Sequence, residues 1–522
     1  MRRTAEGLDD PGVRPAARRH AVPRAAGPAA GLGALVLIAF MASLAIPGTF
    51  RLGPVNLTVY RLVLIAACIP LGLRWIRGGA GPVSAVDLIY LANCLWISIA
   101  LVMVHGLSRI IYVGTNFIEL FGAYLVGRVL VRDAATHRTF VRCMAGLLLL
   151  FAPFALIEAL TGQRLFDQVF GTFMSVQDRS ADAPRLGFIR AAVAFSHPIH
   201  FGLFGSVVFA NLYFLLWRRR EIVRTGAAAF VAVTTMLSIS SSALFSLVLQ
   251  VAMIVWERGL GFLRNRWAIG LAIGAGFLLV LLASVQGGLF TYIVENLIFS
   301  PGAGEHRMEI YQYGTREVLR HPLFGVGLND WARPFWREHP TIDSFWMMTA
   351  IRSGIPAVTL LVLAVLLGML QIGSARGLDE DGRQYRTGYM IALAGLVLVL
   401  STVHVWGPAV VFVMCYLGAG SWFYTSDHRP ARPGPARMRR EREAARRGGA
   451  AAGDGDDGHP GGQPGGRPGN RRGNRERIVR SGPVGYERGP GRRHGSKAVG
   501  GAGRGPRGAV GPEAGPGLRK RV

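Results

Sequence analysis

The amino-acid sequence predicts an all-α polytopic membrane protein with about twelve transmembrane helices. Its 522 residues are 51% hydrophobic and 17% charged, with a mean hydropathy of +0.33. Soluble domains carry about a quarter charged residues, so this composition excludes an ordinary soluble protein. Apolar windows of about 20 residues, enough to cross a bilayer core, recur along the chain. The expected helices lie near 32–48, 57–76, 86–104, 112–131, 140–160, 198–217, 225–240, 242–256, 267–286, 355–373, 386–404 and 407–424.

The basic residues of the short connections predict the orientation of these helices. Lys and Arg are retained on the cytoplasmic side of a membrane, and arginines occur in alternate connections. They are Arg74, Arg77, Arg128, Arg132, Arg138, Arg218, Arg219, Arg220, Arg224, Arg258, Arg264, Arg266, Arg376, Arg383 and Arg386. Both termini are therefore expected in the cytoplasm. Two long loops, about 161–197 and 287–354, are expected on the extracytoplasmic face, and such loops often carry function.

The two ends of the chain differ in composition from the apolar part. Residues 1–30 are polar and rich in Arg, and residues 427–522 consist largely of Gly, Pro and Arg. Segments with so few large apolar residues cannot bury a core, so both are expected to be disordered and cytoplasmic. The membrane part is then 31–426. Anionic membrane lipids are expected partners of the basic tail, whereas no specific nucleic acid is expected.

Motifs of nucleotide and metal enzymes are missing from the sequence. It has no GxxxxGK[ST] phosphate loop, no HExxH and no GxGxxG between a strand and a helix, so neither a cofactor nor a metal is predicted. An Asp-x-Asp pattern at 379–381 lies in a short connection, where a solvated turn is the favoured interpretation. Four cysteines fall singly in apolar windows and are expected to be packing residues. They are Cys68, Cys94, Cys143 and Cys415.

Few ionisable residues fall inside the apolar windows, chiefly Arg61, Glu119 and Glu158. An ionisable side chain at such depth is a functional-site candidate by default. Each of the three, however, lies alone or near the end of its window, and no pair of carboxylates marks an ion pathway. The two glutamates are therefore expected to be packing or interface residues.

The stretch 185–200, between two long apolar windows, is the most distinctive part of the sequence. It holds Arg185, Arg190, His197 and His200 among aromatic residues. Arg offers planar bidentate donors that stay protonated. Fixed cations at a bilayer surface therefore predict an anionic ligand.

The second long loop is expected to be partly helical. On a helix over 304–322, Arg307 and Tyr311 share one face, whereas Arg316 lies on another. Closely spaced glycines in 323–331 predict a tight turn that brings the backbone near a ligand or another helix. Taken alone, this loop could be only an amphipathic cap on the helix bundle.

Three segments resemble a known family, the bacterial O-antigen ligase and Wzy-type polysaccharide polymerase superfamily of multispanning membrane proteins. The first is Arg190 with Phe-Ser-His-Pro-Ile-His-Phe-Gly at 195–202. The second is Arg307 with His-Pro-Leu-Phe-Gly-Val-Gly at 321–327, and the third is Thr-Ile-Asp-Ser-Phe-Trp at 341–346. The resemblance covers roughly residues 32–424 and depends on the order of these segments and their placement between helices.

The resemblance implies a metal-independent inverting glycosyltransferase on the outer face of the bacterial plasma (inner) membrane. Family members transfer a glycan from a polyprenyl diphosphate to another glycan, a lipid or a protein. The implied reaction is polymerisation of repeat units of an exopolysaccharide or O-antigen, with ligation to a lipid or protein acceptor as the alternative. The implied partners are the lipid-linked oligosaccharide, its acceptor, and other polysaccharide assembly and export proteins.

The resemblance also implies which arginines hold the diphosphate. Arg190 and Arg307 are the first candidates, and Arg185 and Arg316 are the second. One departure concerns 240–242, where relatives often end a membrane helix with a Ser-Arg pair and this chain has three serines. One phosphate contact of the family is therefore missing.

The acceptor hydroxyl must lose a proton as it attacks the anomeric carbon, so a base is needed within hydrogen-bond reach. Many family members carry a His-Asn pair where this chain has Ile342 and Asp343. Asp343 is the first candidate for the base. His197 and His339 are the alternatives.

Two other classes of protein stay open. A lipid-linked oligosaccharide flippase or exporter would also be polytopic, basic and without nucleotide motifs, but it predicts cations that line a cavity within the membrane. A non-catalytic assembly or anchoring subunit would use the basic tail to recruit cytoplasmic partners.

Overall fold

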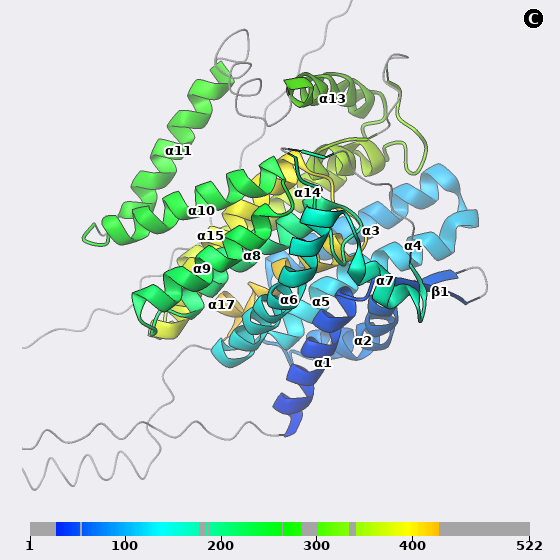
Figure 1. The fold of residues 1–522 in the computed structure, drawn as a ribbon. Coiled ribbons are helices and arrows are strands. Elements are labelled where there is room, and N and C mark those ends of the chain that lie inside the picture. Colours follow the sequence, from blue (N-terminus) through cyan, green and yellow to red (C-terminus); the bar gives the residue numbers. More distant parts are fainter. Residues whose placement is uncertain are drawn as a thin grey trace, which may run out of the picture. The chain divides into compact units, whose positions relative to one another are not determined.

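The computed structural model describes residues 28–52, 55–176, 184–185, 187–263, 265–283, 301–333 and 341–426. Helices make up most of this part of the chain (Figure 1). Nine helical stretches within it are long and apolar enough to cross a membrane, which confirms the predicted class of an all-α polytopic membrane protein. They are α2 (Val59–Ile76), α3 (Ala85–His105), Leu107–Leu130, α6 (Ala134–Thr161), α8 (Pro198–Leu215), α10 (Ser241–Gly259), α14 (Phe345–Ser374), α15 (Glu380–Thr402) and Pro408–Thr425.

Two of these stretches are built from shorter elements. The first joins η1 (Leu107–Arg109), α4 (Ile110–Phe117), the π-helical turn η2 (Ile118–Gly122) and α5 (Ala123–Leu130). The second joins α16 (Pro408–Ala419) and α17 (Trp422–Thr425).

The other three predicted windows also lie on helices. They are α1 (Pro28–Leu44), α9 (Glu221–Met236) and α11 (Arg266–Ala283). The first two have only 17 and 16 residues, fewer than the predicted span needs. The sequence divides the windows 225–240 and 242–256 at the polar run 238–242, and this interruption is present, because α9 ends before it and α10 begins within it.

The helices run alternately between two ends of the bundle. One end gathers the connections after α6, α9 and α15, where Ala191 N donates to Leu237 O and Phe345 N donates to Val403 O, both at 3.0 Å. We call it the histidine end. The other, the Arg128 end, gathers the connections after α2, α5, α8 and α14. The topology in the membrane and the cytoplasmic location of the Arg128 end stay predictions.

Small residues allow α5 and α16 to pack closely. A Cβ on Gly127 would collide with the carbonyl oxygen of Cys415, and one on Gly418 would collide with that of Tyr124. Between helices in lipid there is no hydrophobic driving force, so close backbone packing of this kind matters more. The four cysteines are free thiols, two of them buried and two partly buried.

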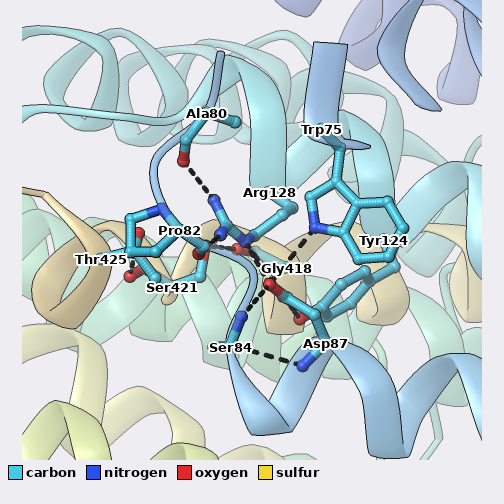
Figure 2. Close-up of polar contacts among 10 residues, drawn as sticks. All are labelled: Trp75, Ala80, Pro82, Ser84, Asp87, Tyr124, Arg128, Gly418, Ser421 and Thr425. Carbon is cyan, nitrogen blue, oxygen red and sulfur yellow. Dashed lines mark hydrogen bonds and ion pairs between the residues drawn. The ribbon is translucent and has the colours of Figure 1, made fainter. Parts of the chain in front are cut away.

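A buried ion pair joins α3 and α5 at the Arg128 end, as Figure 2 shows. Arg128 Nε donates to the two carboxylate oxygens of Asp87, at 3.0 and 3.1 Å, and neither side chain is exposed. The Nη groups of Arg128 donate to the carbonyl oxygens of Ala80 and Pro82. Tyr124 donates its hydroxyl to Asp87 at 2.6 Å. Buried charges are tolerated when they are paired and hydrogen-bonded in this way.

The position of Arg128 near the end of a window predicts an arginine of a short connection. The structure shows instead a fully buried side chain. It lies in α5, and its guanidinium satisfies the backbone that follows α2. Asp87 also begins α3, because it forms a capping box with Ser84, with Ser84 N to the carboxylate at 2.9 Å and Asp87 N to the hydroxyl at 3.2 Å. One carboxylate thus starts a helix and neutralises a cation of its neighbour.

The helix α14 begins before the predicted window 355–373 and is broken inside. Gly354 has a non-helical backbone, with φ 80° and ψ 175°. Pro356 has no N–H to donate to Arg352 O, and the break at Gly354 turns the N–H of Ile355 away from Ile351 O. Two carbonyl groups and one N–H of the helix backbone therefore need partners elsewhere.

The turn 321–327 supplies these partners. Val326 N donates to Ile351 O at 2.8 Å, Gly327 N donates to Arg352 O at 3.0 Å, and Pro322 O accepts from Ile355 N at 2.7 Å. The glycines predicted to bring the backbone near another helix thus do so. The second long loop and α14 are joined as a result.

A small antiparallel sheet lies at the histidine end and is not anticipated by the all-α prediction. Its order is β2 (Val55–Thr58), β1 (Gly48–Leu52) and β3 (Ser175–Val176). The register pairs Thr49 with both Thr58 and Ser175. The sheet thereby ties the segment after α1 to the first long loop.

Replacing Arg128 by Met should destabilise the protein by about 3–5 kcal/mol, because the Asp87 carboxylate would be buried without a counter-charge. The measurement is the midpoint of thermal unfolding in detergent. Arg138→Met is the matched control, since Arg138 lies 3.8 Å from Asp381 at the same end and is more exposed. We expect it to cost less than about 1 kcal/mol. Equal losses in the two variants would contradict the role of the buried pair.

Candidate functional site

Chain segments that are far apart in the sequence meet at one connection of the histidine end, residues 401–406. Tyr311 of α13 (Pro301–Arg320) donates its hydroxyl to Ser401 O at 3.0 Å. Trp346 of α14 donates Nε1 to the Ser401 hydroxyl at 3.2 Å. His200 Nε2 lies 3.2 Å from His404 O. The first and third segments that carry the family resemblance, and the helix that holds Arg307 of the second, therefore border one site.

Arg190 is buried beside the interruption between α9 and α10, with 5% of its surface exposed. Its Nε donates to Ser238 O at 3.4 Å, and the next backbone N–H donates to Leu237 O. On the other side of the interruption, the hydroxyl of Ser242 lies 2.9 Å from that of Thr402. The polar interruption thus holds Arg190 near the 401–406 connection. The guanidinium lies deeper than the exposed rim where the sequence predicts its cations.

The loop that carries Arg190 and the interruption beside it are both strained. Val193 in the loop and Ile239 in the interruption are β-branched, yet they have φ values of 50° and 43°. Such conformations cost about 1–3 kcal/mol each and persist only where the surroundings enforce them. Glu158 of α6 does so, because its buried carboxylate accepts from Val193 N at 2.9 Å and lies 3.5 Å from Arg164 Nε. This function goes beyond the packing role predicted for Glu158.

His197 caps the N-terminus of α8. Its Nδ1 accepts from Ile199 N at 3.2 Å, so this nitrogen carries no proton. The neutral ring then has its proton on Nε2, which is a hydrogen-bond donor and not a base. To take up a proton on Nδ1, His197 would have to release the helix cap.

Three imidazole rings surround the indole of Trp406. The ring centroids of His200, His404 and His197 lie 4.2, 5.7 and 6.0 Å from it. Trp406 itself is 44% exposed. His404 and Trp406 are not among the residues predicted from the sequence. A His and a Trp at the junction of the windows 386–404 and 407–424 are the signal that could have indicated them.

His404 is neutral at physiological pH. Burial, and next the charge of Arg352, lower the pKa of His404 from its ordinary 6.5 to about 4. Arg352 lies at the break of α14 and is exposed. It adds a cation to this end of the bundle that the sequence analysis does not single out.

The helix predicted over 304–322 is present as α13. Val318 is buried, and Tyr311 reaches the 401–406 connection. Arg307 lies one turn before Tyr311 in this helix, and its side chain is outside the described part of the chain. Arg316 is exposed and stacks on Tyr313, with its guanidinium 5.3 Å from the ring centroid. Arg316 is thus on a more open side of the helix than Val318.

Asp343 lies in the extended stretch that leads into α14 and is partly buried. Ser344, the next residue, caps α14 through its hydroxyl. Phe345 N donates to Val403 O, so the backbone next to Asp343 pairs with the 401–406 connection. His339, the other candidate in this segment, is outside the described residues.

No protein-family model and no curated protein matches this chain. The resemblance therefore depends on the residues themselves, which the structure separates into two groups. Arg190, His197 and Asp343 lie on segments that contact the 401–406 connection. Arg185 lies earlier in the first loop, in a turn closed by two backbone hydrogen bonds with Phe188, at 2.9 and 3.0 Å.

Arg61 and Glu119, which the sequence places alone or near the ends of their windows, form an ion pair between two helices. Arg61 Nε donates to Glu119 Oε1 at 2.6 Å, and Tyr60 donates its hydroxyl to the same oxygen at 3.0 Å. Glu119 lies in η2, and single π-helical turns inside α-helices are frequent at functional sites. The sequence missed the pair because its members belong to different helices.

The Asp-x-Asp pattern at 379–381 is divided among separate tasks. Asp379 caps α15, Glu380 pairs with Arg383, and Asp381 accepts from Arg218 Nε at 2.9 Å. The expected turn is present, but Asp381 is not simply solvated, because it joins its own connection to the one after α8 through Arg218. The carboxylates do not converge on one point, as a metal site would require.

Glu158→Ala should destabilise the protein by about 1–3 kcal/mol, because the buried Val193 N–H would lose its acceptor. Glu158→Gln keeps an acceptor oxygen and should lose less. Thermal unfolding of both variants in the same detergent makes the comparison. If Gln costs as much as Ala, the interaction with Arg164 and not the hydrogen bond to Val193 is what matters.

The thermal stability of the protein should fall as the pH drops from about 6.5 to 4. In this window the unfolded chain protonates His404 while the folded chain does not, so the unfolded state binds more protons and stability rises with pH. His404→Phe keeps a ring against Phe345 and removes the titration. Its unfolding midpoint should fall less over the same window, and an unchanged slope would contradict the assignment.

Proposed function

We propose that the chain is a metal-independent inverting glycosyltransferase, which transfers a glycan from a polyprenyl diphosphate to an acceptor hydroxyl. The observation that supports this most is the meeting of three chain segments at the 401–406 connection. They bring a buried arginine, a carboxylate and neutral imidazoles to one end of a bundle of membrane helices. A lipid-linked donor with an anionic leaving group requires such groups where hydrocarbon meets water.

Arg190 is proposed to stabilise the diphosphate as it leaves. A guanidinium stays protonated and offers five N–H donors. The hydrogen bond from Nε to Ser238 O and the strained loop fix its position before substrate binds. Removing one preorganised donor of this kind costs roughly 3 kcal/mol of transition-state stabilisation. Arg307 is proposed as the second contact, and Arg185 and Arg316 as contacts further from the reacting bond.

Asp343 is the proposed base. The acceptor oxygen attacks the anomeric carbon and forms the new C–O bond, while the bond from that carbon to the diphosphate oxygen breaks and the electron pair leaves with the diphosphate. The hydroxyl proton passes to the Asp343 carboxylate. His197 is better suited to donate from Nε2 to a sugar oxygen, because its Nδ1 is held by the cap of α8.

The proposed reaction is polymerisation of repeat units of an exopolysaccharide or O-antigen. Ligation to a lipid or protein acceptor would use the same donor and leaving group. The proposal requires the histidine end to face away from the cytoplasm of a bacterial plasma membrane, with both termini inside. The arginines of the short connections predict that orientation.

A flippase or exporter is less well supported. It would need cations that line a path through the membrane. Within the described residues, Arg74, Arg142 and Arg386 lie within two residues of the end of a predicted window, whereas Arg61 and Arg128 lie further in and are bonded to Glu119 and Asp87. Their charges hold helices together, whereas Arg190 lies at a loop.

The test is turnover of a polyprenyl-diphosphate oligosaccharide by the purified protein in vesicles, without nucleotide or metal. The wild type should produce longer lipid-linked glycans. Arg190→Ala, Arg307→Ala and Asp343→Asn should each lower kcat by about 100-fold or more, since one preorganised group is lost. Arg109→Ala is the matched control, because Arg109 is an exposed arginine at the same end, and it should stay within about twofold.

The product distinguishes the alternatives. A single transfer to an added lipid acceptor would make the protein a ligase. Movement of intact donor across the vesicle without bond formation would make it a flippase and refute the proposed chemistry. Equal loss in Arg109→Ala and Arg190→Ala would refute the assignment of the diphosphate site.

A further inference from the structure

A cleft of about 720 Å³ opens at the Arg128 end. Three stretches line it: 82–85 at the start of α3, 371–377 at the end of α14, and 423–426 in and after α17. The proposed glycan transfer takes place at the opposite end and does not use it. The cleft lies among the connections in which most arginines of the membrane part are found.

Hydrogen bonds from within the bundle hold the walls of the cleft. Figure 2 shows the wall that contains Pro82 and Ser84, where Arg128 donates to Pro82 O at 2.8 Å. Arg386 donates to Ala375 O at 2.8 Å in the second wall. Ser426 in the third wall donates its hydroxyl to the backbone of the α5–α6 connection at 2.7 Å. The cleft is therefore formed before any ligand arrives.

Two polar groups of the lining are not used in this way. Arg376 is exposed, and its side chain makes no hydrogen bond or ion pair with the residues that the structure describes. Gln371 Oε1 is buried and has no hydrogen-bond partner within the same part of the chain. A cation and a buried acceptor that line the same cleft suit a ligand that has both an anionic group and a hydroxyl donor.

The surroundings of the cleft favour a lipid over a soluble ligand. Val83, which lines the cleft, is a large exposed apolar residue, and Leu370, Leu366 and Leu363 form an exposed apolar face of α14 that precedes the lining residue Gln371. An apolar crevice between α3 and α14 adjoins the cleft, since Tyr424 lines both. A headgroup in the cleft would therefore have hydrocarbon next to it on the bilayer side.

We propose that this cleft binds the headgroup of an anionic glycerophospholipid such as phosphatidylglycerol. The phosphate contacts the Arg376 guanidinium, a glycerol hydroxyl donates to Gln371 Oε1, and the acyl chains follow the exposed apolar face of α14. The site is independent of the glycan-transfer site, so each proposal can fail without the other.

The test is a titration of the purified full-length protein with phosphatidylglycerol, followed by native mass spectrometry. The wild type should retain one lipid at least tenfold more tightly than phosphatidylcholine. Arg376→Gln should weaken it about tenfold, because one charge-assisted contact is lost. Arg219→Gln is the matched control, an exposed arginine at the same end that does not line the cleft, and it should stay within twofold.

A second variant tests the cleft by its shape. Ser374→Trp places a large ring in the cleft and should also remove the bound lipid, with an unfolding midpoint like that of the wild type without lipid. If Arg376→Gln does not fold, this variant decides the result. Three outcomes would overturn the proposal: equal weakening in Arg219→Gln, retention of phosphatidylcholine as tight as that of phosphatidylglycerol, or displacement of the lipid by millimolar inorganic phosphate.

Discussion

The need to satisfy backbone polar groups inside a membrane governs this fold more than any single contact. A continuous helix meets that need by itself, but an interrupted one does not. Each interruption described here has found specific partners. The turn 321–327 provides the hydrogen-bond partners of the broken helix α14. Arg128 donates to the backbone carbonyl groups of the connection after α2. Arg190 Nε and the backbone N–H of the next residue donate to those of the interruption between α9 and α10. The candidate site is located where such hydrogen bonds bring loops from distant parts of the chain together.

The sequence predicts well what depends on composition along the chain. Window length and hydropathy found the helices, and the polar run at 238–242 marked a true interruption. Contacts between helices could not be predicted in this way. Arg61 and Glu119 look isolated in the sequence, and Arg128 looks like a loop residue, because nothing local says which helices are neighbours. For the same reason the sequence found the segments of Arg190 and Asp343 but not the 401–406 connection to which both lead.

Arginine has two distinct uses in this protein. Arg128 in α5 and Arg386 in α15 donate to a carboxylate and to backbone carbonyl groups of the bundle, so their role is structural. Arg190 is also held by a hydrogen bond to the bundle, but it lies in a loop. Hydrogen-bond geometry thus separates the structural arginines from the candidate binding ones, which neither net charge nor position in the sequence could do. The cap of α8 acts similarly on His197, since it fixes the nitrogen that carries the proton.

The buried ion pairs also have a consequence for the way the chain is made. Synthesis proceeds from the N-terminus, so Arg61 and Asp87 reach the membrane before their partners, which follow 58 and 41 residues later. Both residues lie in the first turn of their helices, where water and headgroups can solvate a charge, but each can be buried inside the bundle only once its partner is present. The stretch from α2 to α5 is the shortest one in which both charges are neutralised. It is therefore the smallest part of this protein that can bury both charges as ion pairs.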